Sequence, residues 1–156
     1  MTITIDQIKK LRGETGFGVM DVRKALEETK GSEKKAIDLL KKWGIQKSEK
    51  KLSRETKAGI VESYIHGEGK VGVLLELLCE TDFVARTDEF KRLAHELCLQ
   101  ISSMNPKNVK MLLEQEYIRD PEFKVGDLVK QVIGKLGENI AVSRFIRFKL
   151  GENSFS

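Results

Sequence analysis

The chain has 156 residues, a formal net charge of +4, 40% hydrophobic residues and 33% charged residues. This length fits one ordinary domain or two small ones and excludes a large multidomain machine. The balance of apolar and charged residues is typical of a globular protein and excludes a disordered or fibrous chain. Residues 1–57 hold 15 Lys and Arg against 9 Asp and Glu. The rest of the chain is slightly acidic, which indicates two units with different roles.

The first residues lack the basic, apolar and cleavage-site pattern of a secretion signal, and no apolar run approaches the roughly 20 residues of a membrane helix. We therefore expect a cytoplasmic protein. Cys79 and Cys98 form neither a CxxC pair nor a zinc-ligand pattern, so we predict two reduced, buried thiols. His66 and His95 are the only histidines, and no hydrolytic motif accompanies them. We predict no metal or cofactor site and no catalytic residues.

Residues 1–46 predict three short helices. Thr4 and Gln7 match a capping box at the start of the first helix. Apolar residues at helical spacing predict a second helix over 19–29 and a third that ends at Gly44. Trp43, the single tryptophan, is expected to supply much of this small core.

Residues 47–57 are polar and basic, so we expect a linker or a connecting helix there. The basic side chains around this segment are Lys41, Lys42, Lys47, Lys50, Lys51, Arg54 and Lys57. Such a run binds nucleic acid through phosphates, or is simply a solvated basic face. The absence of interleaved aromatic residues for base stacking favours the solvated face.

From residue 58 the pattern changes to an α+β unit. Residues 59–66 and 71–78 predict two antiparallel strands, and the glycines between them spell GxGxxG. Because an apolar strand follows these glycines rather than a helix, we predict a hairpin turn and not a phosphate loop. Helices are predicted after Thr87 and over 109–116 and 125–136, and a third strand over 139–148. The apolar residues of this strand do not alternate cleanly, which indicates either a bulge or burial on both faces. The predicted core domain, residues 58–156, has helices on one face of a small antiparallel sheet of about three strands.

The stretch Thr81–Val84 follows a buried strand, where a rigid scaffold can present a loop. One interpretation makes Phe83 a partner-facing wedge beside an acid. In the other, Asp82 caps the next turn and Phe83 fills the core. The residues alone favour the second.

Several segments together resemble the bacterial elongation factor Ts family. The first is Leu11-Arg12 with Thr15-Gly16 and Met20-Asp21, the second is Cys79 to Val84, and the third is Gly137 to Ile140 with Arg144-Phe145. The three occur in order over nearly the whole chain.

The resemblance implies a ubiquitin-associated-like domain over residues 1–46 and a guanine-nucleotide exchange factor for elongation factor Tu that does no covalent chemistry. The partner-binding residues that it implies are Leu11, Arg12, Val19, Met20, Thr81, Asp82, Phe83 and Val84. Asp82 and Phe83 would disturb the magnesium site of the partner.

Only one core unit fits in this chain, so it resembles a short form of the family. A homodimer, formed across sheet edges, would supply a second copy of the core unit. The alternative function is a small ribosome- or RNA-associated protein that uses the basic segment 41–57, although we expect no nucleic-acid partner.

Overall fold

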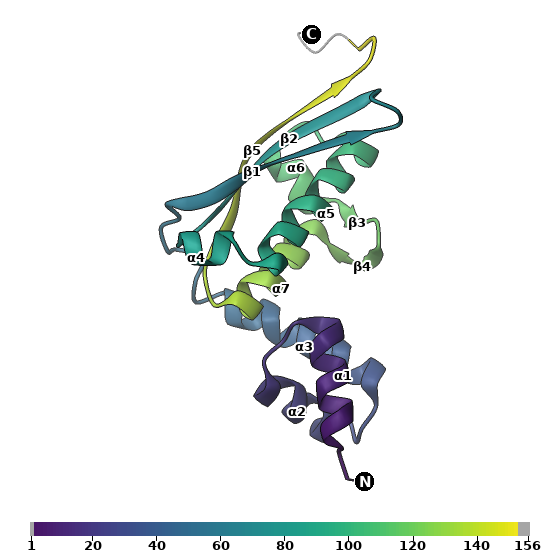
Figure 1. Cartoon of the computed structure of the whole chain (residues 1–156), viewed down its shortest axis with the longest axis vertical. Coiled ribbons are helices and arrows are strands. Elements are labelled where there is room, and N and C mark those ends of the chain that lie inside the picture. The colour runs from purple at the N-terminus through teal and green to yellow at the C-terminus, as the bar shows by residue number, and fades with distance from the viewer. Residues whose placement is uncertain (1, 153–156) are drawn as a thin grey trace.

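The computed structural model describes residues 2–152 and consists of two packed parts arranged along the long axis of the molecule (Figure 1). The first part, called the head, contains α1 (Ile5–Thr15), α2 (Val19–Glu28) and α3 (Glu33–Ser48). The second part, called the core unit, contains β1 (Ala58–His66), β2 (Val71–Cys79), α4 (Asp82–Ala85), α5 (Asp88–Met104), α6 (Val109–Glu114), β3 (Glu116–Tyr117), β4 (Asp120–Lys124), α7 (Val125–Leu136) and β5 (Ile140–Lys149). No helix within residues 2–152 has both the length and the apolar composition needed to cross a membrane.

The predicted capping box begins α1. The backbone N–H of Gln7 donates to Thr4 Oγ1 at 3.2 Å, and the N–H of Thr4 donates to Gln7 Oε1 at 3.1 Å. The buried residues of the head come from all three helices and the first turn: Leu11, Phe17, Val22, Ala25, Leu26, Ala36 and Leu40. Trp43 is only partly buried against this cluster, so it contributes less of the core than the sequence led us to expect.

The sequence predicted that the third helix ends at Gly44. In the structure, α3 continues to Ser48. Gly44 is buried where α3 crosses α7. A Cβ atom built on Gly134 of α7 would meet the carbonyl oxygen of Gly44 and lie 2.5 Å from its Cα. Gly44 is therefore a packing residue that lets two helices approach closely, and this crossing joins the head to the core unit.

A three-stranded antiparallel sheet in the order β1-β2-β5 forms the core unit, which confirms the predicted α+β fold. The β1–β2 turn contains Gly67, Glu68 and Gly69, all at positive φ, so the GxGxxG stretch is a hairpin turn. Arg144 pairs with Glu76 and Val142 pairs with Leu77, which leaves Ser143 as the extra residue of a bulge in β5. Of the two explanations that the sequence left open for the third strand, a bulge or burial on both faces, the structure shows the bulge.

Helices cover one face of this sheet, as Figure 1 shows. The inner residues of β2 pack with α5 and α7 in one cluster that includes Val73, Leu75, Leu77, Phe90, Leu97, Ile101 and Ile133. A second, two-stranded sheet of β3 and β4 was not predicted. It is held by the buried amide of Gln100, which donates to the Glu116 carbonyl and accepts from the Ile118 N–H, both at 3.1 Å.

The close α3–α7 crossing predicts that alanine substitutions at two helical glycines change the free energy of unfolding in opposite directions. Gly134→Ala should lower the free energy of unfolding by about 1–3 kcal/mol, because the new methyl group overpacks the crossing. Gly13→Ala, in exposed α1 with nothing within 4 Å of the added Cβ, should raise it by about 0.5–1 kcal/mol through helix propensity. Urea unfolding measures both, and a more stable Gly134→Ala protein would contradict the packing role.

Candidate partner-binding site

The stretch Thr81–Val84, called the wedge loop, follows β2 and forms the N-cap and the first three residues of the short helix α4. In Figure 1, α4 lies at the end of the core unit that is nearer to the head. Phe83 is 81% exposed, whereas Val84 is 5% exposed and Ala85 4%. The turn therefore buries two successive residues and displays the aromatic ring that precedes them.

The residue-based preference for a core role of Phe83 is wrong, because the α4 turn directs Val84 inward instead. Asp82 is not the cap either. Thr81 is the N-cap of α4, and its Oγ1 accepts from the Val84 N–H at 3.3 Å. Within residues 2–152, the exposed carboxylate of Asp82 has no hydrogen bond or ion pair, so it is available to an outside group.

Three hydrogen bonds, two with Glu138 and one with Cys79, hold the backbone and side chain of Thr81. The Thr81 N–H donates to Glu138 Oε1 at 3.0 Å, and the Thr81 hydroxyl donates to Glu138 Oε2 at 2.7 Å. The thiol of Cys79 donates to the Thr81 carbonyl oxygen at 3.2 Å. Sequence reasoning missed Glu138, which lies 57 residues away from Thr81; its place in the Gly137–Ile140 motif was the signal available.

Both cysteines are free and buried, as predicted. Burial raises the pKa of the Cys79 thiol, and the nearby carboxylates of Glu138 and Asp82 raise it further. Burial likewise raises the pKa of Cys98 to about 12. Both sulfurs are therefore protonated at neutral pH, and Cys79 acts as a hydrogen-bond donor rather than a nucleophile.

A second exposed group, called the head patch, consists of Arg12 near the end of α1 with Val19 and Met20 at the start of α2. Met20 is 74% exposed and Val19 43%, and Arg12 is also exposed. Leu11 is fully buried in the head, so its side chain supports α1 from within. Of the eight partner-binding residues that the resemblance implied, Leu11 and Val84 are buried and the other six are exposed.

Carboxylates neutralise much of the basic segment. Four of its cations are paired: Lys41 with Asp120 at 3.0 Å, Lys47 with Asp21 at 2.6 Å, Arg54 with Glu80 at 3.6 Å and Lys57 with Glu55 at 3.5 Å. The segment thus carries less free positive charge than its composition suggested. The part of the chain from 2 to 152 contains no group of three or more His, Cys, Asp or Glu placed to hold a metal.

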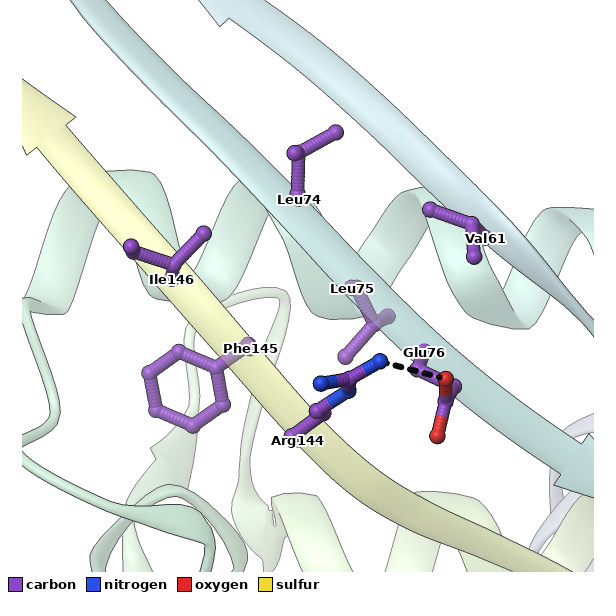
Figure 2. A pocket seen from close by; sticks show the side chains of 7 residues that line it. All are labelled: Val61, Leu74, Leu75, Glu76, Arg144, Phe145 and Ile146. Atoms are coloured by element: carbon purple, nitrogen blue, oxygen red, sulfur yellow. Dashed lines mark hydrogen bonds and ion pairs between the residues drawn. The ribbon is translucent and has the colours of Figure 1, made fainter.

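The outer face of the sheet is apolar, which is unusual for an antiparallel sheet with one uncovered side. Val61 and Ile65 of β1, Leu74 of β2 and Ile146 and Phe148 of β5 are each 45–67% exposed. Figure 2 shows a shallow pocket on this face, with Glu76 and Arg144 side by side in an ion pair of 3.3 Å.

Comparison with known proteins identifies close relatives. The family model described as "Elongation factor TS" matches residues 80–156, a range that begins directly before the wedge loop. The Elongation factor Ts of Coprothermobacter proteolyticus is 42% identical over 197 residues, covering 97% of this chain and 100% of the relative. That of Thermotoga neapolitana is 42% identical over 195 residues, covering 97% and 99%. That of a Thermoanaerobacter species is 40% identical over 195 residues, covering 96% of both.

These relatives are longer than the chain. The alignment with the Coprothermobacter protein spans 197 residues while the chain has 156, so at least 41 aligned positions have no counterpart here. The chain is therefore shorter than relatives that match almost all of it.

The exposure of Phe83 predicts that the ring contributes little to folding. Phe83→Ala should change the free energy of unfolding by less than about 0.5 kcal/mol. In contrast, Phe90→Ala removes a fully buried ring and should cost about 3–5 kcal/mol. Denaturant unfolding of both variants is the measurement, and equal losses would mean that Phe83 packs in the core after all.

Proposed function

The chain belongs to the Elongation factor Ts family, and we propose that it acts in the cytoplasm as the guanine-nucleotide exchange factor of elongation factor Tu. The family assignment makes it a translation elongation factor. The proposal adds what the factor does: it binds the GTPase and speeds the release of GDP. This activity requires binding alone and no covalent chemistry.

The observation that carries the proposal is the exposed ring of Phe83 on a rigid support. Aromatic side chains are enriched among the residues that carry most of the binding energy when a partner buries them. Val84 and Ala85 anchor the α4 turn by packing in the core, and the Glu138 carboxylate holds Thr81 at the start of the turn. Because the backbone of the turn is already held, less conformational entropy is lost when the ring is buried by a partner.

Exchange follows from linkage between two ligands of the partner. If the factor binds the nucleotide-free GTPase more tightly than the GDP-bound form, then GDP weakens binding of the factor by the same ratio. Each 1.4 kcal/mol of this coupling changes the affinity tenfold. In the ternary complex both ligands are therefore held more loosely than in either binary complex, and GDP leaves faster.

We propose that Phe83 supplies this coupling by displacing partner side chains near the magnesium ion and the phosphate loop. Magnesium bridges a nucleotide and its protein, and backbone N–H groups of the loop cradle the diphosphate. A ring inserted beside them disturbs both contacts. The unpaired Asp82 is placed to accept hydrogen bonds from partner groups that the ring moves.

The head patch serves affinity in this proposal. Arg12, Val19 and Met20 combine an exposed cation with two exposed apolar side chains, a combination that favours a mixed apolar and acidic surface on the partner. This patch and the wedge loop would contact the partner at two places. The head patch would provide affinity for the partner, and the wedge loop would promote the release of GDP.

Phe83→Ala should slow GDP release at saturating factor by about tenfold or more while the protein stays folded, because the group that couples the two ligands is gone. Stopped-flow release of fluorescent GDP from elongation factor Tu measures the rate. Arg12→Ala is the matched comparison, and it should raise the dissociation constant with a smaller effect on the maximal rate. Wild-type rates for Phe83→Ala would remove the wedge from the account.

We further propose that the outer face of the sheet pairs with a second copy of the chain, which would supply the second core unit that a single chain has no room for. Support comes from the exposed apolar residues of β1, β2 and β5 and from the Glu76–Arg144 pair within them. A two-fold axis through this pair lets each Glu76 meet the Arg144 of the other copy, so the face is self-complementary. Face-to-face packing, rather than pairing at the sheet edges, buries these residues.

The size of the face predicts a weak dimer. Nine-residue strands span about 30 Å and three strands about 14 Å, so the contact covers about 400 Å² on each copy, which is less than most stable interfaces bury and is typical of a weak, transient contact. Sedimentation over a concentration series should show a monomer–dimer equilibrium. Leu74→Lys should abolish it, whereas Leu52→Lys, which changes a similarly exposed leucine elsewhere, should not. A monomer at all concentrations, free and in complex with the partner, would exclude the dimer.

A further inference from the structure

We propose that Glu138 is a positioning residue for exchange: by holding Thr81, its carboxylate sets the position of Phe83. This inference rests on the proposed exchange function. It concerns a residue that would not touch the nucleotide and that acts through the wedge loop.

The contact between Glu138 and Thr81 uses every donor that Thr81 has. One carboxylate oxygen accepts the backbone N–H at 3.0 Å, and the other accepts the hydroxyl hydrogen at 2.7 Å. Hydrogen bonds to a charged acceptor are stronger than neutral ones, and two of them fix an orientation as well as a distance. The same hydroxyl oxygen accepts from the Val84 N–H, so the chain of bonds runs from Glu138 to the residue that follows Phe83.

The backbone that carries Glu138 is itself fixed. Gly137, at φ 76°, ends α7, and its N–H donates to the Ile133 carbonyl. Asn139 is buried, and its backbone N–H donates to Glu80 Oε1 at 2.8 Å. Its side-chain amide donates to the carbonyl oxygens of Leu52 and Arg54 at 3.3 and 2.8 Å. Glu138 therefore projects from a turn that is itself held by hydrogen bonds on both sides.

Loss of the carboxylate should loosen the loop without unfolding the core unit. Val84 and Ala85 keep their burial in the core, but Thr81 loses both bonds to Glu138 and keeps those with the Cys79 thiol and the Val84 N–H. Phe83 then samples several directions, and only a fraction of complexes place it correctly. Since the maximal rate is reduced by that fraction while the head patch still binds, the rate should fall more than the affinity.

Glu138→Ala tests this with two independent readouts. In GDP release from elongation factor Tu, the maximal rate should fall about tenfold, the equivalent of roughly one charge-assisted hydrogen bond. The factor concentration at half-maximal rate should change less than about twofold. In amide hydrogen exchange of the free chain, the Thr81 and Val84 amides should exchange faster, while those of Leu75 and Leu77 in the central strand stay protected. Glu114→Ala, an exposed glutamate on α6, is the matched control and should resemble the wild type.

The outcomes separate this inference from the proposed function. If the wild type accelerates release and Glu138→Ala keeps its full maximal rate, the positioning role is overturned and the exchange function stands. If only the half-maximal concentration shifts, Glu138 contacts the partner directly and the inference is also overturned. If the wild type does not accelerate release at all, both proposals fall. Should Glu138→Ala lose protection throughout the core, Glu138→Gln, which keeps one acceptor at the same length, must show a smaller loss of the maximal rate.

Discussion

The burial of Val84 and Ala85 is the constraint on which the position of the exposed Phe83 ring depends. A helical turn cannot direct three successive side chains inward, so anchoring these two in the core forces the preceding ring of Phe83 into solvent. Thr81 caps the turn and Glu138 holds the cap. The exposed aromatic ring is thus produced by ordinary core packing and capping rather than by strain.

A second constraint fixes the head to the core unit. Gly44 and Gly134 allow α3 and α7 to cross at close range. Next to this crossing, the Lys135 ammonium lies 4.9 Å from the centre of the Phe17 ring and 3.8 Å from a Glu89 carboxylate oxygen. Burial lowers the pKa of Lys135, while Glu89 acts in the opposite direction. The head patch and the wedge loop therefore belong to one packed structure, as the proposed contact with a partner at two places requires.

Features set by neighbours in the chain could be predicted from the sequence. The capping box at Thr4, the glycine turn of the hairpin and the apolar face of α7 each depend on residues a few positions apart. Other features depend on residues distant in the chain. Gly44 has the sequence pattern of a helix end, but it lies inside α3 because α7 packs against it. Thr81 forms its hydrogen bonds with Glu138, which lies 57 residues further along the chain. The β3–β4 hairpin depends on the buried Gln100 and has no alternating pattern of its own.

The most direct test of the central claim is the rate of GDP release from elongation factor Tu as the concentration of the purified chain is raised. The account predicts that the rate rises and saturates, since a ternary complex must form before GDP leaves. A release rate that stays constant over the whole range, under conditions where the chain is folded, would contradict it.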